Sequence, residues 1–201
     1  MVLQHVVDRV YSDMSGNYGG NFGAVVLEDQ VVMIDSGMVH TQMAKVKNWI
    51  IKEFDLPITK LVYTHSHSDH VFGAQGLGEI SRISSYPMYE HCIENMQDNW
   101  KHEKLISGFE PRKDERPELW EALQTLEVQL PDLTFEESLK IGISEDLSIQ
   151  LSGGHTSGSS IISVEPEHVV FIGDLIFNKK FPYIGDTSCN PDLWLHALQK
   201  I

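Results

Sequence analysis

The sequence predicts an α/β fold, and three observations lead to this prediction. Residues 21–35 show the alternating pattern of a strand hairpin. Residues 41–54 have the apolar spacing of an amphipathic helix. Residues 60–64 then form a short apolar run that predicts a buried strand, and the start of another helix follows it. Strands and helices therefore alternate along the first half of the chain, as they do in α/β proteins.

The second half of the chain is expected to be richer in strands. A helix is predicted for residues 87–101, and another begins near residue 116. Between them, residues 102–118 are charged and contain Pro111 and Pro117, which is typical of a connecting segment. Apolar runs predict further strands at residues 83–85, 133–135, 147–151, 160–164 and 169–173.

The segment from Glu94 to Glu118 has two interpretations. It carries aromatic and cationic side chains, Trp100 and Phe109 among them, so it could serve as a lid over a substrate. Segments of mixed charge are more often solvated connectors. We expect the connector.

Length and composition fit one globular domain that spans residues 1–201. The chain has 201 residues, of which 41% are hydrophobic, and a domain of this size can bury a sizeable core. It carries 15 Lys and Arg against 29 Asp and Glu, a formal net charge of −14. Affinity for phosphates comes largely from basic side chains, so this charge weighs against nucleic acids and anionic membranes as partners. The expected partner is a small-molecule substrate, and the oligomeric state stays open, a dimer included.

The two cysteines and the N-terminal residues favour a reducing compartment. Cys92 and Cys189 are too few and too far apart in sequence to indicate a disulfide framework or a thiolate metal site, so free thiols are expected. The first residues lack the basic start and apolar run of a signal peptide, and no stretch is long and apolar enough to cross a membrane. The cytoplasm is therefore the expected location.

The segment Thr64-His65-Ser66-His67-Ser68-Asp69-His70 is the most specific signal in the chain. Three imidazoles and one carboxylate fall within six residues, in the pattern H-x-H-x-D-H. These groups supply the nitrogen and oxygen ligands that zinc and similar divalent ions prefer. Residues two apart in an extended segment point to the same side, so His65 and His67 can hold one ion. Asp69 and His70 follow, where the chain must turn, and can face a second ion. The segment also follows a predicted strand, where open α/β sheets place their sites.

Two weaker signals occur later in the chain. His155 lies in the segment Gly153-Gly154-His155-Thr156-Ser157-Gly158-Ser159, whose small residues let an imidazole approach an ion without steric conflict. Asp174 follows the apolar run at residues 169–173, which would deliver its carboxylate at the end of a buried strand. Each signal alone is more typical of an ordinary turn. After the H-x-H-x-D-H segment, both residues become candidate metal ligands.

The order of these motifs resembles the metallo-β-lactamase superfamily of metal-dependent hydrolases. The resemblance begins at residues 21–27 and 31–37, which are similar to the family's opening hairpin and its IDxG turn, and it continues to Asp174. It implies a four-layered αβ/βα sandwich. In that fold two mixed β-sheets pack together, helices lie outside them, and the metals lie at one sheet edge.

The resemblance also implies how the ligands are divided between two divalent ions. The implied ligands of the first ion are His65, His67 and His155. Those of the second ion are Asp69 and His70, with Asp174 bridging the two. Zinc is the expected metal, with iron and manganese as alternatives. A hydroxide shared by the ions would attack the substrate, because metal binding lowers the pKa of water from about 15.7 toward 7. Asp69 is the candidate catalytic residue, as a group that orients or moves a proton.

The chain departs from the family pattern near its end. Family members carry one more His, in a turn similar to PGHG after the bridging Asp, and no residue here matches it. The last histidine is His196, on a predicted helix that Asn190 caps and Pro191 opens. We expect His196 at the surface, the domain to be short at its C-terminus, and the second ion to lack one ligand. The opposite face of this helix is predicted to carry Leu193, Trp194, Ala197, Leu198 and Ile201.

The expected function is metal-dependent hydrolysis of an ester, thioester, lactone or related bond in a small substrate. Two alternatives stay open. One is a mononuclear iron oxidoreductase similar to the sulfur dioxygenases of the superfamily. The other is a metal-binding domain without catalysis, which the missing ligand motivates. Asp35 and Asp186 could orient metal ligands through hydrogen bonds, and Asp35, at a strand end, is the better candidate.

Overall fold

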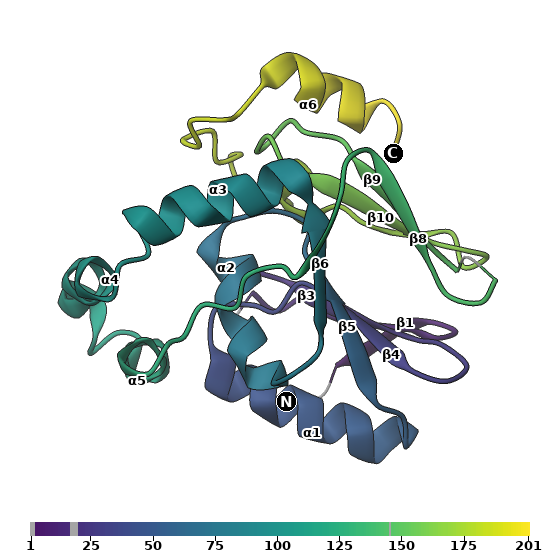
Figure 1. The fold of residues 1–201 in the computed structure, drawn as a ribbon, viewed down its shortest axis with the longest axis horizontal. Coiled ribbons are helices and arrows are strands. Elements are labelled where there is room, and N and C mark those ends of the chain that lie inside the picture. The colour runs from purple at the N-terminus through teal and green to yellow at the C-terminus, as the bar shows by residue number, and fades with distance from the viewer. Residues whose placement is uncertain (1–2, 17–19, 145) are drawn as a thin grey trace.

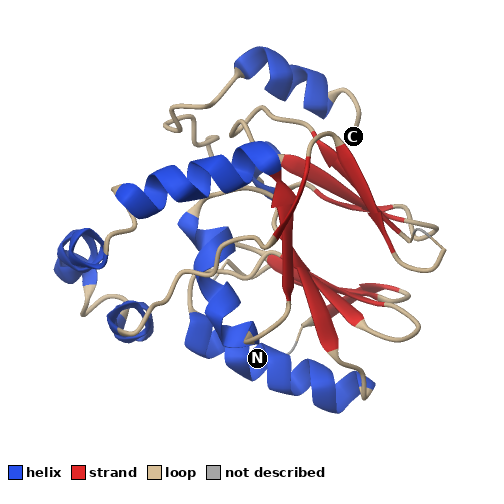
Figure 2. Ribbon diagram, in the orientation of Figure 1, coloured by secondary structure: helices blue, strands red, loops and turns tan. Residues whose placement is uncertain are grey.

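Two β-sheets pack face to face, with helices on their outer sides (Figure 1; Figure 2). The computed structural model describes residues 3–16, 20–144 and 146–201. The larger sheet has seven strands in chain order: β1 (Gln4–Val7), β2 (Val10–Asp13), β3 (Phe22–Val26), β4 (Val31–Ile34), β5 (Ile58–Val62), β6 (Ser81–Ser85) and β7 (Leu133–Phe135). The smaller sheet has four strands: β8 (Ser138–Ile141), β9 (Leu147–Leu151), β10 (Ser160–Val164) and β11 (Val169–Phe171), in the order β11-β10-β9-β8.

Only the larger sheet is mixed, which corrects the expectation of two mixed sheets. Strands β1 to β4 pair antiparallel, and β4 to β7 pair parallel. In the smaller sheet every described pair is antiparallel. Connection length explains the difference, because parallel neighbours need a long crossover whereas short turns join antiparallel ones. Helical segments connect the parallel strands, while the strands of the smaller sheet follow one another through short loops.

The helices complete the outer layers of the sandwich. They are α1 (His40–Phe54), α2 (Ser68–Val71), α3 (Tyr86–Gln97), α4 (His102–Phe109), α5 (Pro117–Gln124) and α6 (Pro191–Leu198), with short 3₁₀ segments at Phe72–Leu77, Glu110–Arg112 and Gly173–Leu175. Helix α1 lies on the outer side of the larger sheet, and α6 lies across the molecule on the outer side of the smaller sheet (Figure 1). This gives the α-β-β-α order of a four-layered sandwich. No helix in the described part of the chain combines the length and apolar character needed to span a membrane.

Alternate residues of the central strands supply two separate cores. Val32 and Ile34 of β4 face the smaller sheet, where they belong to one buried cluster with Ile149 and Ile162. Met33, between them in sequence, faces the other way and packs with the inner side of α1. A strand that is buried on both faces needs apolar residues at consecutive positions, which explains the run Val-Val-Met-Ile.

The inner side of α1 anchors the helix to the sheet and allows a matched test of burial. Ile50 is fully buried, whereas its neighbour Ile51 is 41% exposed. Ile50→Ala should lower the free energy of unfolding by about 3 kcal/mol, the usual cost of a large-to-small change in a core. Ile51→Ala should change it by less than about 1 kcal/mol. Urea unfolding of both variants measures this difference, and equal losses would contradict the placement of the helix.

Several predicted elements are confirmed, and others were missed or displaced. The hairpin, the helix at residues 41–54 and the strands at 133–135, 147–151 and 160–164 all occur. Strands β1, β2 and β8 were not predicted, because they are short and carry few apolar residues. Asn190 caps α6 as expected, since its side chain accepts hydrogen bonds from the amides of Asp192 and Leu193. His196 is exposed, also as expected.

The apolar face predicted for α6 is only partly buried. Trp194 and Ala197 pack against the smaller sheet, but Leu193, Leu198 and Ile201 are exposed. The helix has eight residues, and only one of its turns reaches the sheet. The full five-residue face was therefore a wrong prediction.

The segment from Glu94 to Glu118 is mostly exposed, but two of its side chains are anchored in the core beside the larger sheet. Trp100 is buried against Phe72, with 5.2 Å between ring centroids, and Leu105 of α4 belongs to the same cluster. These side chains support the fold and are unavailable to a substrate. The interpretation as a connector agrees with this arrangement, because the charged residues of the segment are exposed while Trp100 and Leu105 fix it to the core.

Candidate metal centre

The H-x-H-x-D-H segment lies where the larger sheet meets the first residues of β10. Strand β5 ends at Val62, and the chain then passes through an irregular loop into α2. The carbonyl oxygen of Thr64 accepts a hydrogen bond from the Ser160 amide at 2.9 Å, which joins the loop to the smaller sheet. The histidines of the loop are thus held between the two sheets.

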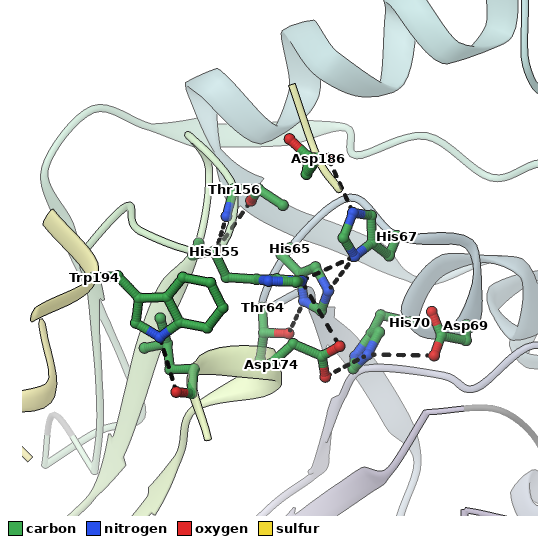
Figure 3. Close-up of polar contacts among 12 residues, drawn as sticks. Thr64, His65, His67, Asp69, His70, His155, Thr156, Asp174, Asp186 and Trp194 are labelled. Atoms are coloured by element: carbon green, nitrogen blue, oxygen red, sulfur yellow. Dashed lines mark hydrogen bonds and ion pairs between the residues drawn. The ribbon is translucent and has the colours of Figure 1, made fainter. Parts of the chain in front are cut away.

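Four of the six predicted ligands converge on one point (Figure 3). His65, His67, His155 and Asp174 each offer one ligand atom, and these atoms lie within 4.8 Å of one another. His67 Nδ1 lies 3.2 Å from His65 Nε2 and 3.0 Å from His155 Nε2. A tetrahedral zinc ion with Zn–N bonds of about 2.0–2.1 Å holds its nitrogen ligands about 3.3 Å apart. The observed separations therefore fit one ion held by three imidazoles.

The other two predicted ligands lie beside this group. His70 Nε2 is 3.3 Å from Asp174 Oδ1 and 3.9 Å from Asp69 Oδ2. It is buried and has no hydrogen-bond partner among the described residues. Such a nitrogen is costly unless a ligand satisfies it. Asp174 contacts both His70 and His155 of the four-ligand group, because its Oδ1 faces His70 Nε2 and its Oδ2 is 3.7 Å from His155 Nε2.

Asp35, which directly follows β4, orients Thr64 and His70 through hydrogen bonds. Strands β4 and β5 are parallel neighbours with Ile34 beside Val62, so their ends meet. Asp35 Oδ1 accepts the Thr64 amide at 2.7 Å, and Oδ2 accepts the Thr64 hydroxyl at 2.7 Å and His70 Nδ1–H at 2.8 Å. The Thr64 oxygen in turn lies 3.0 Å from His65 Nδ1 and accepts its proton. These bonds hold His65 and His70 in the tautomer that leaves Nε2 free to bind an ion.

The electrostatics of the site favour the neutral form of two candidate ligands, His65 and His155, and the protonated form of a third, His70. Burial, followed by the charges of His70 and His67, holds the pKa of His65 well below its ordinary value. Burial likewise lowers the pKa of His155 to about 4. Both imidazoles are then neutral at neutral pH, which metal binding requires. Burial would also lower the pKa of His70, but Asp35 and Asp174 outweigh it and raise that pKa well above the ordinary value.

Asp174, which contacts both His70 and His155, is held as a carboxylate. Burial would raise its pKa, but the close contact with His70 Nε2 at 3.3 Å and the charge of that ring outweigh burial and lower the pKa. The preceding Gly173 has a φ of +51°, and a Cβ there would lie 2.6 Å from Thr64 Oγ1. The Gly-Asp pair is thus explained by close approach of the backbone to the Asp35–Thr64 network.

A cavity opens onto the ligand group. It has a volume of about 390 Å³ and is lined by His67, Ser68, Asp69, Asp174, Phe177 and Tyr183. The Tyr183 ring packs edge-on against His67, with 5.6 Å between centroids. The side chain of Asp69 is 35% exposed, which makes it the most open of the predicted ligands. The cavity is therefore bounded by candidate metal ligands together with two aromatic rings.

Sequence reasoning missed the residues that support and surround the ligands. Phe177 and Tyr183 line the cavity, but an isolated aromatic residue in a loop has no distinctive sequence pattern. Thr64 was quoted only as the first residue of the motif, because its role depends on contact with a strand end far away in sequence. Asp186 was ranked below Asp35, yet it lies 2.9 Å from His67 Nε2. Lys179 and Lys180 are exposed on the loop that follows Asp174.

Fold and site together define an α/β protein of the four-layered sandwich type with a cluster of His and Asp side chains that could hold a metal ion. The family model of the metallo-beta-lactamase superfamily matches residues 16–200, so the chain belongs to that superfamily. Two solved structures resemble it, each with a TM-score of 0.70. A metallo-beta-lactamase from Pontibacter korlensis is 17% identical, and the match covers 98% of this chain and 83% of that one. A metallo-beta-lactamase from Hirschia baltica is 16% identical, with coverage of 98% and 82%. The resemblance and the fold class predicted from the sequence are confirmed.

Proposed function

We propose that the protein is a metal-dependent hydrolase that cleaves an ester, thioester, lactone or related bond in a small substrate. The observation that carries this proposal is the convergence of four ligand atoms within 4.8 Å, two of them from residues that line a cavity, His67 and Asp174. Membership of a superfamily that includes hydrolases supports it. A divalent ion held by these residues would lower the pKa of a bound water toward 7 and would polarise the scissile bond.

The residues around the cavity have separate proposed tasks. His65, His67 and His155 would hold the first ion, and Asp69 and His70 a second, with Asp174 shared between them. Asp69 is also placed to accept a proton at its carboxylate oxygen, because it lines the open cavity next to Asp174. Phe177 and Tyr183 would bound the substrate and exclude water from one side.

The substrate and setting are part of the same proposal. A cavity of about 390 Å³ suits a small molecule. The formal charge of −14 weighs against nucleic-acid and anionic-membrane partners. We propose a cytoplasmic enzyme acting on a small molecule, with zinc as its metal.

A mononuclear iron oxidoreductase is the second candidate, and one observation favours it. The four grouped ligands surround a single point, while Asp69 and His70 lie outside that group. Two of its three histidines together with Asp174 would supply the two-histidine, one-carboxylate ligand set that is common for non-haem iron. Bound iron, together with oxygen uptake on a persulfide substrate, would establish this candidate.

Metal removal and reloading test the proposal. We expect about two zinc ions per chain by plasma mass spectrometry after incubation with zinc, the count for a two-metal site. The loaded protein should hydrolyse a simple chromogenic ester such as p-nitrophenyl acetate. Dialysis against a chelator should abolish this hydrolysis, and zinc should restore it. One tightly bound ion with no turnover of any ester or thioester would instead indicate a metal-binding domain without catalysis.

A further inference from the structure

After Asp174 the chain returns over the metal centre and is fastened to the loop that carries His155. We call residues 183–190 the return segment. The amide of Asn190 donates to the carbonyl oxygen of Gly154 at 2.8 Å, and the amide of Ser157 donates to Ser188 Oγ at 2.9 Å. These two bonds flank His155 on both sides. The return segment therefore has a fixed position relative to one of the ligand loops.

Asp186 connects the return segment to a second ligand loop, the one that carries His67. Asp186 Oδ2 lies 2.9 Å from His67 Nε2 (Figure 3). Its other oxygen, Oδ1, accepts the Ser188 amide at 2.8 Å and the Ser188 hydroxyl at 2.5 Å. The Asp186 side chain is only 6% exposed. Both carboxylate oxygens are thus engaged, and the one that faces His67 cannot turn away without breaking the bonds to Ser188.

The contact determines which nitrogen of His67 can bind an ion. A carboxylate only accepts hydrogen bonds, so the proton of a neutral His67 ring must be on Nε2. The lone pair is then on Nδ1, the nitrogen that lies next to His65 Nε2 and His155 Nε2. His65 offers the opposite nitrogen, Nε2, because Thr64 engages its Nδ1. Thr64 therefore fixes the tautomer of His65 but not that of His67, which needs a different hydrogen-bond partner. Asp186 is the charged side chain in contact with His67 Nε2.

We propose that Asp186 is a positioning residue that holds His67 with Nδ1 facing the metal. The inference rests on the proposed metal centre and assigns to it a support outside the H-x-H-x-D-H segment. Hydrogen bonds to the second nitrogen of a metal-binding histidine fix its tautomer and orientation, and their loss typically costs about 10–100-fold in metal affinity. A purely structural role for Asp186 is the competing explanation, because its bonds to Ser188 also stabilise the turn.

Three variants separate these explanations. Asp186→Asn keeps the volume of the side chain but replaces a charged acceptor with a neutral amide, whose NH₂ group would favour the wrong tautomer of His67. Ser188→Ala removes both bonds of the Ser188 hydroxyl, the one it donates to Asp186 Oδ1 and the one it accepts from the Ser157 amide, but it leaves the Ser188 amide bond and the contact between Asp186 and His67. Asp192→Asn removes one negative charge from an exposed position on α6 and is the matched control. Zinc affinity is measured by competition with a chromophoric chelator, and the tautomer of His67 by ¹⁵N NMR of the imidazole rings.

We expect Asp186→Asn to weaken zinc binding about 10–100-fold. The metal-free variant should show a population of His67 with its proton on Nδ1, whereas the original protein shows the proton on Nε2. Ser188→Ala should weaken zinc binding less than about threefold, and Asp192→Asn should leave it unchanged, since neither removes a partner of a ligand nitrogen. Circular dichroism confirms that the variants are folded.

Two results would overturn the inference. One is an unchanged zinc affinity in Asp186→Asn. The other is an equal loss in Asp186→Asn and Ser188→Ala with the tautomer unaltered, because that pattern indicates a structural role in the turn. Failure of the proposed function is distinguishable from these results. Loss of hydrolysis alone would leave the zinc affinities of the variants measurable, whereas a protein without a metal centre would bind no zinc in any variant.

Discussion

Replacing His65 with alanine is expected to remove the first metal ion and essentially all hydrolytic activity. The imidazole is 1% exposed, and its Nε2 is one of the three nitrogens that surround the proposed ion position. Loss of a direct ligand leaves two histidines and a carboxylate around a position that suits four donors. We expect zinc affinity to fall by more than about 100-fold, beyond the usual cost of losing a supporting hydrogen bond. Metal analysis after gel filtration and an ester hydrolysis assay measure both effects.

The exposed histidine on α6 supplies the control. His196→Ala removes the same side chain from a position at the surface, away from the ligand group. It should retain the metal content and activity of the original protein. Unchanged metal content in His65→Ala would refute the ligand assignment. Metal loss in both variants would point to nonspecific binding by surface histidines.

The ligands were predictable to the extent that their signals are local in sequence. The H-x-H-x-D-H segment places His65, His67 and Asp69 within a few residues, so the pattern is informative before any fold is known. His155 and Asp174 lie far away and become informative only in combination with that segment. Their convergence depends on the packing of two sheets, which the resemblance to a known family supplied and the residues alone did not.

Asp35 and Asp186 were predicted as possible supports of metal ligands, but the ligand that each one contacts and the role of Thr64 could not be predicted, because long-range contacts set them. Thr64 links His65 to Asp35, which is 29 residues earlier, and Asp186 reaches His67 across 119 residues. A hydroxyl or carboxylate in a loop has many uses, and sequence spacing does not select among them. The short polar strands β1 and β8 were missed for a similar reason. They are formed by pairing with a neighbour more than by their own apolar pattern.

Asp35 shows how the backbone of the fold prepares the site. Its φ is +56°, a left-handed conformation that side chains rarely adopt and that Asp tolerates better than most. The conformation turns the chain sharply at the end of β4, beside the end of β5, and brings the carboxylate to Thr64 and His70. Backbone strain of this kind persists where surrounding contacts hold it, and it gathers at functional sites. Here the contacts that hold Asp35 are the same ones that orient two histidines.

Asp35→Ala should therefore damage stability and metal binding together. The change leaves three buried donors without their acceptor: the Thr64 amide, the Thr64 hydroxyl and His70 Nδ1. Each unsatisfied buried group costs about 1–3 kcal/mol, and some will find new partners, so we expect a loss of about 4 kcal/mol in the free energy of unfolding. Zinc affinity should fall about 10–100-fold, because His65 and His70 lose the bonds that fix their tautomers. Urea unfolding of the metal-free protein and a competition titration measure the two losses separately.

Asp55 offers a matched control for the backbone conformation. It ends α1 with a φ of +54°, close to that of Asp35, but it is exposed. Asp55→Ala places alanine in the same left-handed conformation, which should lower the free energy of unfolding by about 1 kcal/mol, but it leaves no buried donor without an acceptor. The difference between the two variants isolates the buried hydrogen bonds, and we expect it to be about 3 kcal/mol. Asp35→Asn refines the result further, because it keeps one acceptor oxygen while removing the charge beside His70. A loss in Asp35→Ala no greater than in Asp55→Ala would mean that the network around Thr64 contributes nothing beyond the turn itself.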